Sequence, residues 1–152
     1  MAEAFIKYDL FKDELMKGGH GNFSTPPALK VMLSNTDADV ATTKSPCTYA
    51  GVSAGQPTGT GYTAGGESAT AAYAYGAPNG TVTISGTAIT WTAGSGGITS
   101  FKHAILYNDS HASKGLIGAW TRAAGAVVLA QSETFTLKFN SAAGSQPMFT
   151  VQ

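Results

Sequence analysis

The chain has 152 residues, of which only 12% are charged, and its nine basic residues balance its nine acidic ones. Ordinary domains carry roughly 25% charged residues, so Gly, Ala, Thr and Ser fill positions that Lys and Glu usually take. A neutral chain offers no overall field to attract nucleic acid or acidic lipid, and we expect neither as a partner. Two interpretations of the low charge stay open: a surface partly covered by a partner protein, or merely a threonine-rich β-surface.

The length fits one domain, and a chain of this size can bury about 70% of its unfolded surface without help from a metal or a disulfide. Cys47 is the single cysteine, so we expect an inert thiol rather than a disulfide or a nucleophile. The start "MAEAFIKYDLFKDELMKG" carries acids among its apolar residues, unlike a signal peptide. The small apolar run at 124–130 is too short to span a membrane. These features predict synthesis and folding in a cytoplasm.

An amphipathic pattern near the N-terminus predicts a helix over residues 3–17. Phe5, Tyr8, Phe11 and Leu15 follow the three- and four-residue spacing of one helix face, and Gly18-Gly19 supplies a stop. We therefore expect residues 1–19 to form an N-terminal helix or arm. A short helix needs a surface to cover its aromatic stripe, which is either the domain's own sheet or a neighbouring subunit.

From residue 28 onward the period changes to that of β-strands. "LKVMLS" alternates in the manner of a strand, whereas residues 36–68 are rich in Gly, Thr, Ser and Pro and predict a long loop with one or two short strands. Further on, "TVTIS" and "TAITWTA" flank Gly86, which predicts a tight hairpin there. "FKHAILYNDS" and "LIGAWT" predict a second hairpin over 101–120.

Short strands at this spacing predict an all-β, jelly-roll-like sandwich over residues 20–152, with one short N-terminal helix. The expected core residues are Leu29, Val31, Ile105, Tyr107, Leu116, Trp120, Phe135, Leu137 and Phe139.

No pattern in the chain predicts catalysis or a resident cofactor. "NTDADV" fails as an EF-hand because Val40 stands where glycine is needed, which leaves at most an irregular calcium site at Asp37 and Asp39. The three histidines lack zinc spacing, and His103 alternates with apolar residues as a sheet histidine would. Ser110 and His111 follow an aspartate, but adjacent residues do not supply triad geometry. We expect no enzyme, no cofactor and no metal.

The order of motifs resembles a group of small virion proteins of tailed bacteriophages, namely the capsid cement (decoration) proteins with a jelly-roll core. The resemblance rests on the aromatic N-terminal segment, "LKVMLSNT", "GTGYTAGG", "FKHAILYNDS" with "GLIGAW", "ETFTLKFN" and a final "MFTVQ", and it covers most of the chain. In place of the acid expected after the aromatic residue of the returning strand, this chain has Thr121-Arg122.

The resemblance implies a protein on the capsid exterior of a virion, which binds the major capsid protein and self-associates as a dimer or trimer. The implied contacts are the N-terminal residues Phe5, Tyr8, Phe11 and Leu15, together with Tyr62 of the glycine-rich loop. A tail-associated or receptor-binding module is the alternative, and exposed tyrosines at 62, 73 and 75 would favour it by stacking on sugars. We expect those tyrosines to be buried strand residues instead. A small hydrolase is a third possibility, for which no catalytic group is found.

Overall fold

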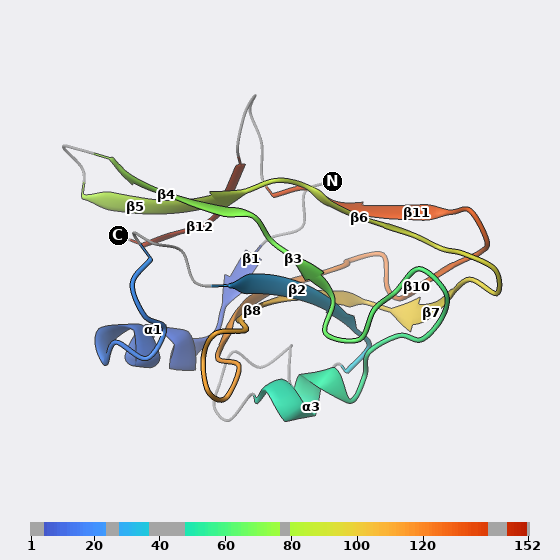
Figure 1. Cartoon of the computed structure of the whole chain (residues 1–152), viewed down its shortest axis with the longest axis horizontal. Coiled ribbons are helices and arrows are strands. Elements are labelled where there is room, and N and C mark those ends of the chain that lie inside the picture. Colours follow the sequence, from blue (N-terminus) through green and yellow to red (C-terminus); the bar gives the residue numbers. More distant parts are fainter. Residues whose placement is uncertain (1–4, 24–27, 37–47, 77–79, 140–145, 152) are drawn as a thin grey trace.

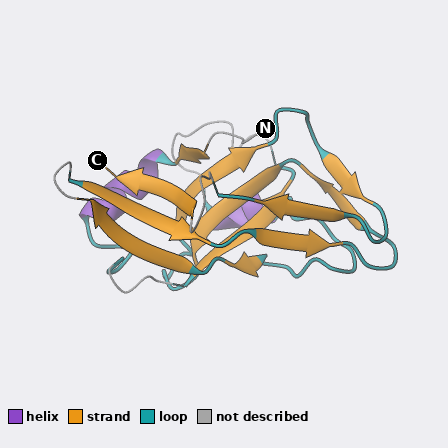
Figure 2. Cartoon of the chain, turned by 90° about the horizontal axis from the view of Figure 1, so that it is seen from above, coloured by secondary structure: helices purple, strands orange, loops and turns teal. Residues whose placement is uncertain are grey.

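The strands of this chain form two layers with helices beneath them. The computed structural model describes residues 5–23, 28–36, 48–76, 80–139 and 146–151. In this part of the chain, α1 (Asp9–Met16) and α3 (Tyr49–Ser53) lie below the lower layer (Figure 1). From above, most strands run along the long axis of the molecule (Figure 2). The antiparallel pairings confirm the predicted all-β, sandwich-like fold; the jelly-roll order of strands stays a prediction.

The lower layer is built around one long strand that is interrupted at Lys102. Its two parts are β7 (Ile98–Phe101) and β8 (His103–Asn108). The sheet that contains β8 has the order β1-β9-β8-β2-β3. Its other strands are β1 (Phe5–Lys7), β9 (Leu116–Thr121), β2 (Leu29–Ser34) and β3 (Glu67–Ser68). β7 pairs separately with β10 (Val127–Leu129). Every residue of β8 is buried. The upper layer lies over one face of this strand, and the helices lie below the other (Figure 1), where Tyr49 of α3 packs against Tyr107. The predicted 101–120 hairpin is confirmed by the antiparallel pairing of β8 with β9.

The upper layer contains β4 (Ala71–Gly76), β5 (Thr81–Gly86), β6 (Ile89–Thr92), β11 (Thr134–Leu137) and β12 (Gln146–Val151). The predicted tight hairpin at Gly86 is wrong. Gly86 is a paired strand residue, opposite Ala71 on β4 and Gln146 on β12. The chain then runs on into β6, which pairs with β11. β5 therefore pairs with β4 and β12, and β6 pairs with β11, instead of β5 and β6 pairing with each other.

The core lies between the two layers and between the lower layer and α1. Large buried side chains include Phe11, Trp91, Phe101, Tyr107 and Phe139. Eight of the nine expected core residues are buried, namely Leu29, Val31, Ile105, Tyr107, Leu116, Trp120, Leu137 and Phe139. The ninth, Phe135, is partly buried and packs against the core.

The N-terminal segment begins as a strand, so the predicted helix over 3–17 is wrong at its start. β1 pairs with β9, and the helix begins only at Asp9. Gly118 explains the difference, because a Cβ at this position would collide with the Phe5 ring and the Ile6 carbonyl. The glycine thus leaves room for Phe5 against the sheet, and tertiary packing overrides helical periodicity. The predicted glycine stop is confirmed by Gly18, which has a φ of 76°.

The region predicted as a long loop, residues 36–68, contains α3 as well as the short strand β3. Thr48 caps α3, because its side chain accepts a hydrogen bond from the backbone N–H of Gly51, as is typical of a helix N-cap. Several residues singled out in the sequence lie outside the described residues, namely Asp37, Asp39, Val40 and Cys47.

Candidate interaction surfaces

A loop rich in glycine and threonine, residues 55–66, is held against strands of both layers at one end of the molecule. Thr58 donates its N–H to Thr99 Oγ1 at 2.7 Å, and its carbonyl accepts the N–H of Thr99 at 2.8 Å. The Thr60 carbonyl accepts the N–H of Gly94 at 2.7 Å. These bonds fix the loop backbone in place.

Two glycines allow this close approach. Gly59 has a φ of 133° and Gly61 a φ of 99°, conformations that L-residues with a Cβ rarely adopt. A Cβ on Gly59 would collide with the Gly97 carbonyl, and a Cβ on Gly61 with the Thr92 carbonyl. The two glycines therefore allow the loop backbone to pack directly against the sandwich.

Tyr62 anchors the loop from within. Its hydroxyl donates to Gln56 Oε1 at 2.8 Å and accepts the N–H of Leu33 at 3.2 Å, while the same Gln56 oxygen accepts the N–H of Gly65 at 2.6 Å. Burial raises the pKa of the Tyr62 phenol well above its ordinary value, so the hydroxyl stays protonated. Tyr62, expected either as a contact or as a buried strand residue, is a half-buried loop residue whose hydroxyl bonds within the chain.

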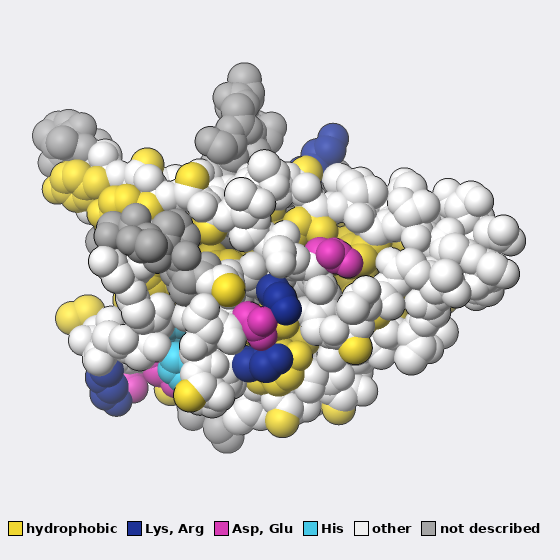
Figure 3. Space-filling view, in the orientation of Figure 1, with side chains coloured by type: hydrophobic (Ala, Val, Ile, Leu, Met, Phe, Trp, Pro, Cys, Tyr) yellow, Lys and Arg dark blue, Asp and Glu magenta, His cyan; other side chains and the backbone are white. Residues whose placement is uncertain are grey.

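The outward-facing residues of this loop and of the neighbouring β6–β7 turn are uncharged. We call the exposed residues 58–61, Thr63 and residues 95–96 the glycine–threonine tip. The face in Figure 3 carries neither charged nor hydrophobic colour over most of its right-hand end, where the β6–β7 turn and the loop meet. Such a surface can contact a partner through backbone and hydroxyl hydrogen bonds.

A second exposed feature is β4, the edge strand of the upper layer. Tyr73 is 40% exposed and Tyr75 is 61% exposed, so the expectation that they would be buried is wrong. They lie opposite Ile84 and Val82 on β5, and alternation places both tyrosines on the same face. We call Ala71–Gly76 the tyrosine strand.

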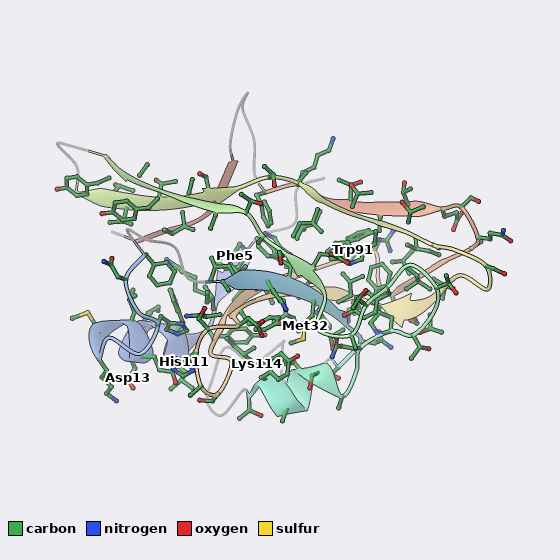
Figure 4. All side chains as sticks on the ribbon, viewed as in Figure 1. Phe5, Asp13, Met32, Trp91, His111 and Lys114 are labelled. Atoms are coloured by element: carbon green, nitrogen blue, oxygen red, sulfur yellow. The ribbon has the colours of Figure 1, made fainter. Side chains whose placement is uncertain are left out.

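The N-terminal residues expected at an interface lie mainly inside the chain. Tyr8 and Phe11 are buried in the core, and Leu15 and Phe5 are partly buried against it. Figure 4 shows Phe5 between the two layers. Of the two alternatives for the aromatic stripe, the structure places it on the domain's own sheet. Residues 5–19 are thus packed against the sandwich.

A carboxylate and two histidines meet where α1 approaches the β8–β9 turn. Glu14 Oε2 lies 3.2 Å from Nε2 of the buried His20 and 4.0 Å from Nε2 of His111, and the two imidazole rings stack with centroids 5.3 Å apart. Although Glu14 is this close, neither ring nitrogen of His20 makes a hydrogen bond to another described residue. Burial is the largest effect and lowers the pKa of His20, against the attraction of Glu14.

The other side of the same turn is held by charges on its surface. Asp109 accepts from Lys30 at 2.9 Å and from Lys114 at 3.1 Å. These two hydrogen bonds lower the pKa of Asp109. Lys114 Nζ also lies 4.8 Å from the ring centre of Tyr49 on α3. Figure 4 shows His111 near α1 and Lys114 on the side facing α3, so the turn joins both helices to the sheet.

These polar groups do not form a hydrolase triad. Asp109 faces the two lysines, Ser110 Oγ accepts the N–H of Ala28, and His111 Nδ1 accepts the N–H of Ser113. His103 is buried and bonds Thr121 through its ring at 3.0 Å, as predicted for a sheet histidine. Within the described residues no group of three metal-ligating side chains is close enough to hold an ion. Nor does any described helix have the length and hydropathy to cross a membrane.

The tyrosine strand is the surface feature that sequence reasoning placed incorrectly. Its signal is compositional: "AAYAYG" contains aromatic residues but no large aliphatic residue. The buried β2 instead carries Leu, Val or Met at four of its six positions, and the buried β8 carries Ile105 and Leu106 at its centre. A strand of alanine and tyrosine is typical of an edge with little to cover.

Comparisons with known proteins identify no relative of this chain: no protein-family model, no curated protein and no solved structure matches it.

Proposed function

We propose that this chain is a capsid cement protein of a tailed bacteriophage, which binds the major capsid protein lattice on the outside of the virion. The proposal rests on the resemblance of its motifs and on one structural observation, the uncharged glycine–threonine tip whose loop is hydrogen-bonded to the neighbouring strands. A cement protein acts by covering seams between capsid subunits, so it requires contact area and a fixed shape instead of a catalytic group.

The tip suits such a contact because its backbone is already ordered. The hydrogen bonds of Thr58 and Thr60 to the neighbouring strands hold the loop in one conformation. A loop that is fixed before binding loses less conformational entropy on association. The contact would be made by hydrogen bonds and shape instead of ion pairs, which agrees with the low charge of the chain.

Reconstitution on phage heads that lack the chain tests this proposal. Wild-type protein should bind such heads to saturation, and Thr63→Arg should reduce binding at least tenfold, because it places a bulky charge on the tip. Ala112→Arg adds the same charge at an exposed position of the β8–β9 turn and should bind as wild type does. Equal binding by both variants would contradict a capsid contact through the tip.

The second candidate function is a tail-associated or receptor-binding module of the same virion. The exposure of Tyr73 and Tyr75 on one face favours it, because aromatic rings can stack on sugar rings. Imaging of labelled protein on intact particles separates the two candidates: signal over the whole shell supports cement, and signal at the tail alone supports the module.

A further inference from the structure

The free edge of β4 lacks the features by which proteins usually protect sheet edges. Among the described residues β4 has only β5 as a strand neighbour, and five of its six residues are exposed. Natural edge strands are commonly guarded by lysine, proline, a bulge or shortness. Ala71–Gly76 contains neither charge nor proline, and its register with β5 runs without a bulge over six residue pairs.

We propose that β4 pairs with β4 of a second copy of this chain, antiparallel across a twofold axis at Ala74. This proposal does not depend on the proposed function.

The order of residues in β4 fits this twofold arrangement. With Ala74 opposite Ala74 of the second copy, Tyr73 lies opposite Tyr75 and Ala72 lies opposite Gly76. Each small residue thus meets a small residue, and each aromatic residue meets an aromatic one. An axis at Tyr73 would instead put Ala71 opposite Tyr75. Strand alternation places all four tyrosines of the pair on one face, where cross-strand aromatic pairs stabilise a sheet.

The charge of this edge favours a second copy over a charged partner. β4 carries no ionisable group other than its two phenols, and β5 beside it carries none. Two identical surfaces meet across a twofold axis, so any charge near the axis would face its own copy. A neutral edge is the condition under which such a contact avoids repulsion.

The area involved sets the expected strength of the dimer. A fully buried tyrosine covers about 150–250 Å², so four partly exposed tyrosines supply at most roughly 600–1,000 Å². Stable interfaces bury about 1,200 Å² or more. We therefore expect a weak dimer, with a Kd in the micromolar range, that becomes important when copies are held close together.

Sedimentation velocity over about 1–500 µM at low ionic strength tests the pairing. Wild type should shift from monomer to dimer with concentration. Ala74→Lys and Ala74→Asp should each stay monomeric, because the twofold axis places the new charge opposite itself at about 4.5–5.5 Å between Cβ atoms. A mixture of the two variants should dimerise again, since lysine then faces aspartate.

Thr134→Lys is the matched control, since it adds a charge at an exposed position of β11 in the same layer and should dimerise as wild type does. Thermal unfolding of each variant establishes that it is folded. Wild type that stays monomeric throughout, Ala74→Lys that dimerises like wild type, or a lysine–aspartate mixture that stays monomeric would each overturn the proposal.

Discussion

Phe5 on β1 lies directly opposite Trp120 on β9, and the centroids of their rings are 4.5 Å apart. The Trp120 ring also contacts Phe139, at 5.4 Å between centroids. Phe5, Trp120 and Phe139 therefore form one aromatic cluster, which joins β1 and the segment after β11 to the β8–β9 hairpin.

Replacing Trp120 by alanine should lower the free energy of unfolding by about 3–5 kcal/mol, because it leaves a large cavity between Phe5 and Phe139. Denaturant unfolding measures this difference. Val128→Ala is the control, because Val128 is 63% exposed and its truncation should change stability by no more than about 0.5 kcal/mol. Equal effects of the two substitutions would contradict the core assigned here.

Deleting residues 1–17 should prevent cooperative folding, because it removes β1 from the edge of β9 and takes buried Tyr8 and Phe11 from the core. Circular dichroism during heating should show no sharp transition in the truncated chain. A truncated chain that still unfolds cooperatively, and differs only in association, would show that this segment is an arm.

Replacing Tyr62 by phenylalanine should lower the free energy of unfolding by about 1–3 kcal/mol. The Leu33 N–H loses the hydroxyl that accepts its hydrogen bond, and Gln56 Oε1 loses the hydroxyl that donates to it. Hydrogen exchange of the Leu33 and Gly65 amides should speed up. Tyr75→Phe removes a hydroxyl from an exposed side chain and should leave both readouts unchanged.

The free energy of unfolding should decrease as the pH falls below about 6.5, the ordinary pKa of histidine. The pKa of His20 is lowered in the folded chain, so the unfolded chain takes up a proton at a pH where the folded chain does not. The loss continues down to the folded-state pKa. His20→Gln cannot titrate and should show a smaller slope between pH 7 and pH 5, measured by denaturant unfolding; an unchanged slope would assign the effect to other groups.

The sequence pattern was sufficient to predict the fold class and the central hairpin, because β8 and β9 each have an apolar centre and are separated by polar turn residues. It was insufficient for Phe5–Lys7. A segment of aromatic and aliphatic residues fits either a helix or a strand, and the outcome depends on the space above Gly118, over 100 residues away. The predicted hairpin at Gly86 was wrong for a related reason. A glycine between two apolar runs marks a turn only if those two runs pair with each other, and β5 and β6 do not.

The surface was harder to predict than the core. Whether Tyr73 and Tyr75 are exposed depends on how far β4 extends past the layer below it, which no local pattern encodes. The role of Tyr62 likewise depends on Gln56 and Leu33, which come close only after the glycine-rich loop has folded against the sheet.

The most direct test of the cement proposal is the copy number of this chain in purified virions, measured by gel densitometry against the major capsid protein. A protein bound to a repeated lattice site should be present in proportion to the capsid protein and spread over the shell. It should also remain bound at about 1 M salt, where ion pairs are screened but apolar and hydrogen-bonded contacts persist. A small, fixed number of copies confined to the tail would contradict the cement function and support the receptor-binding module instead.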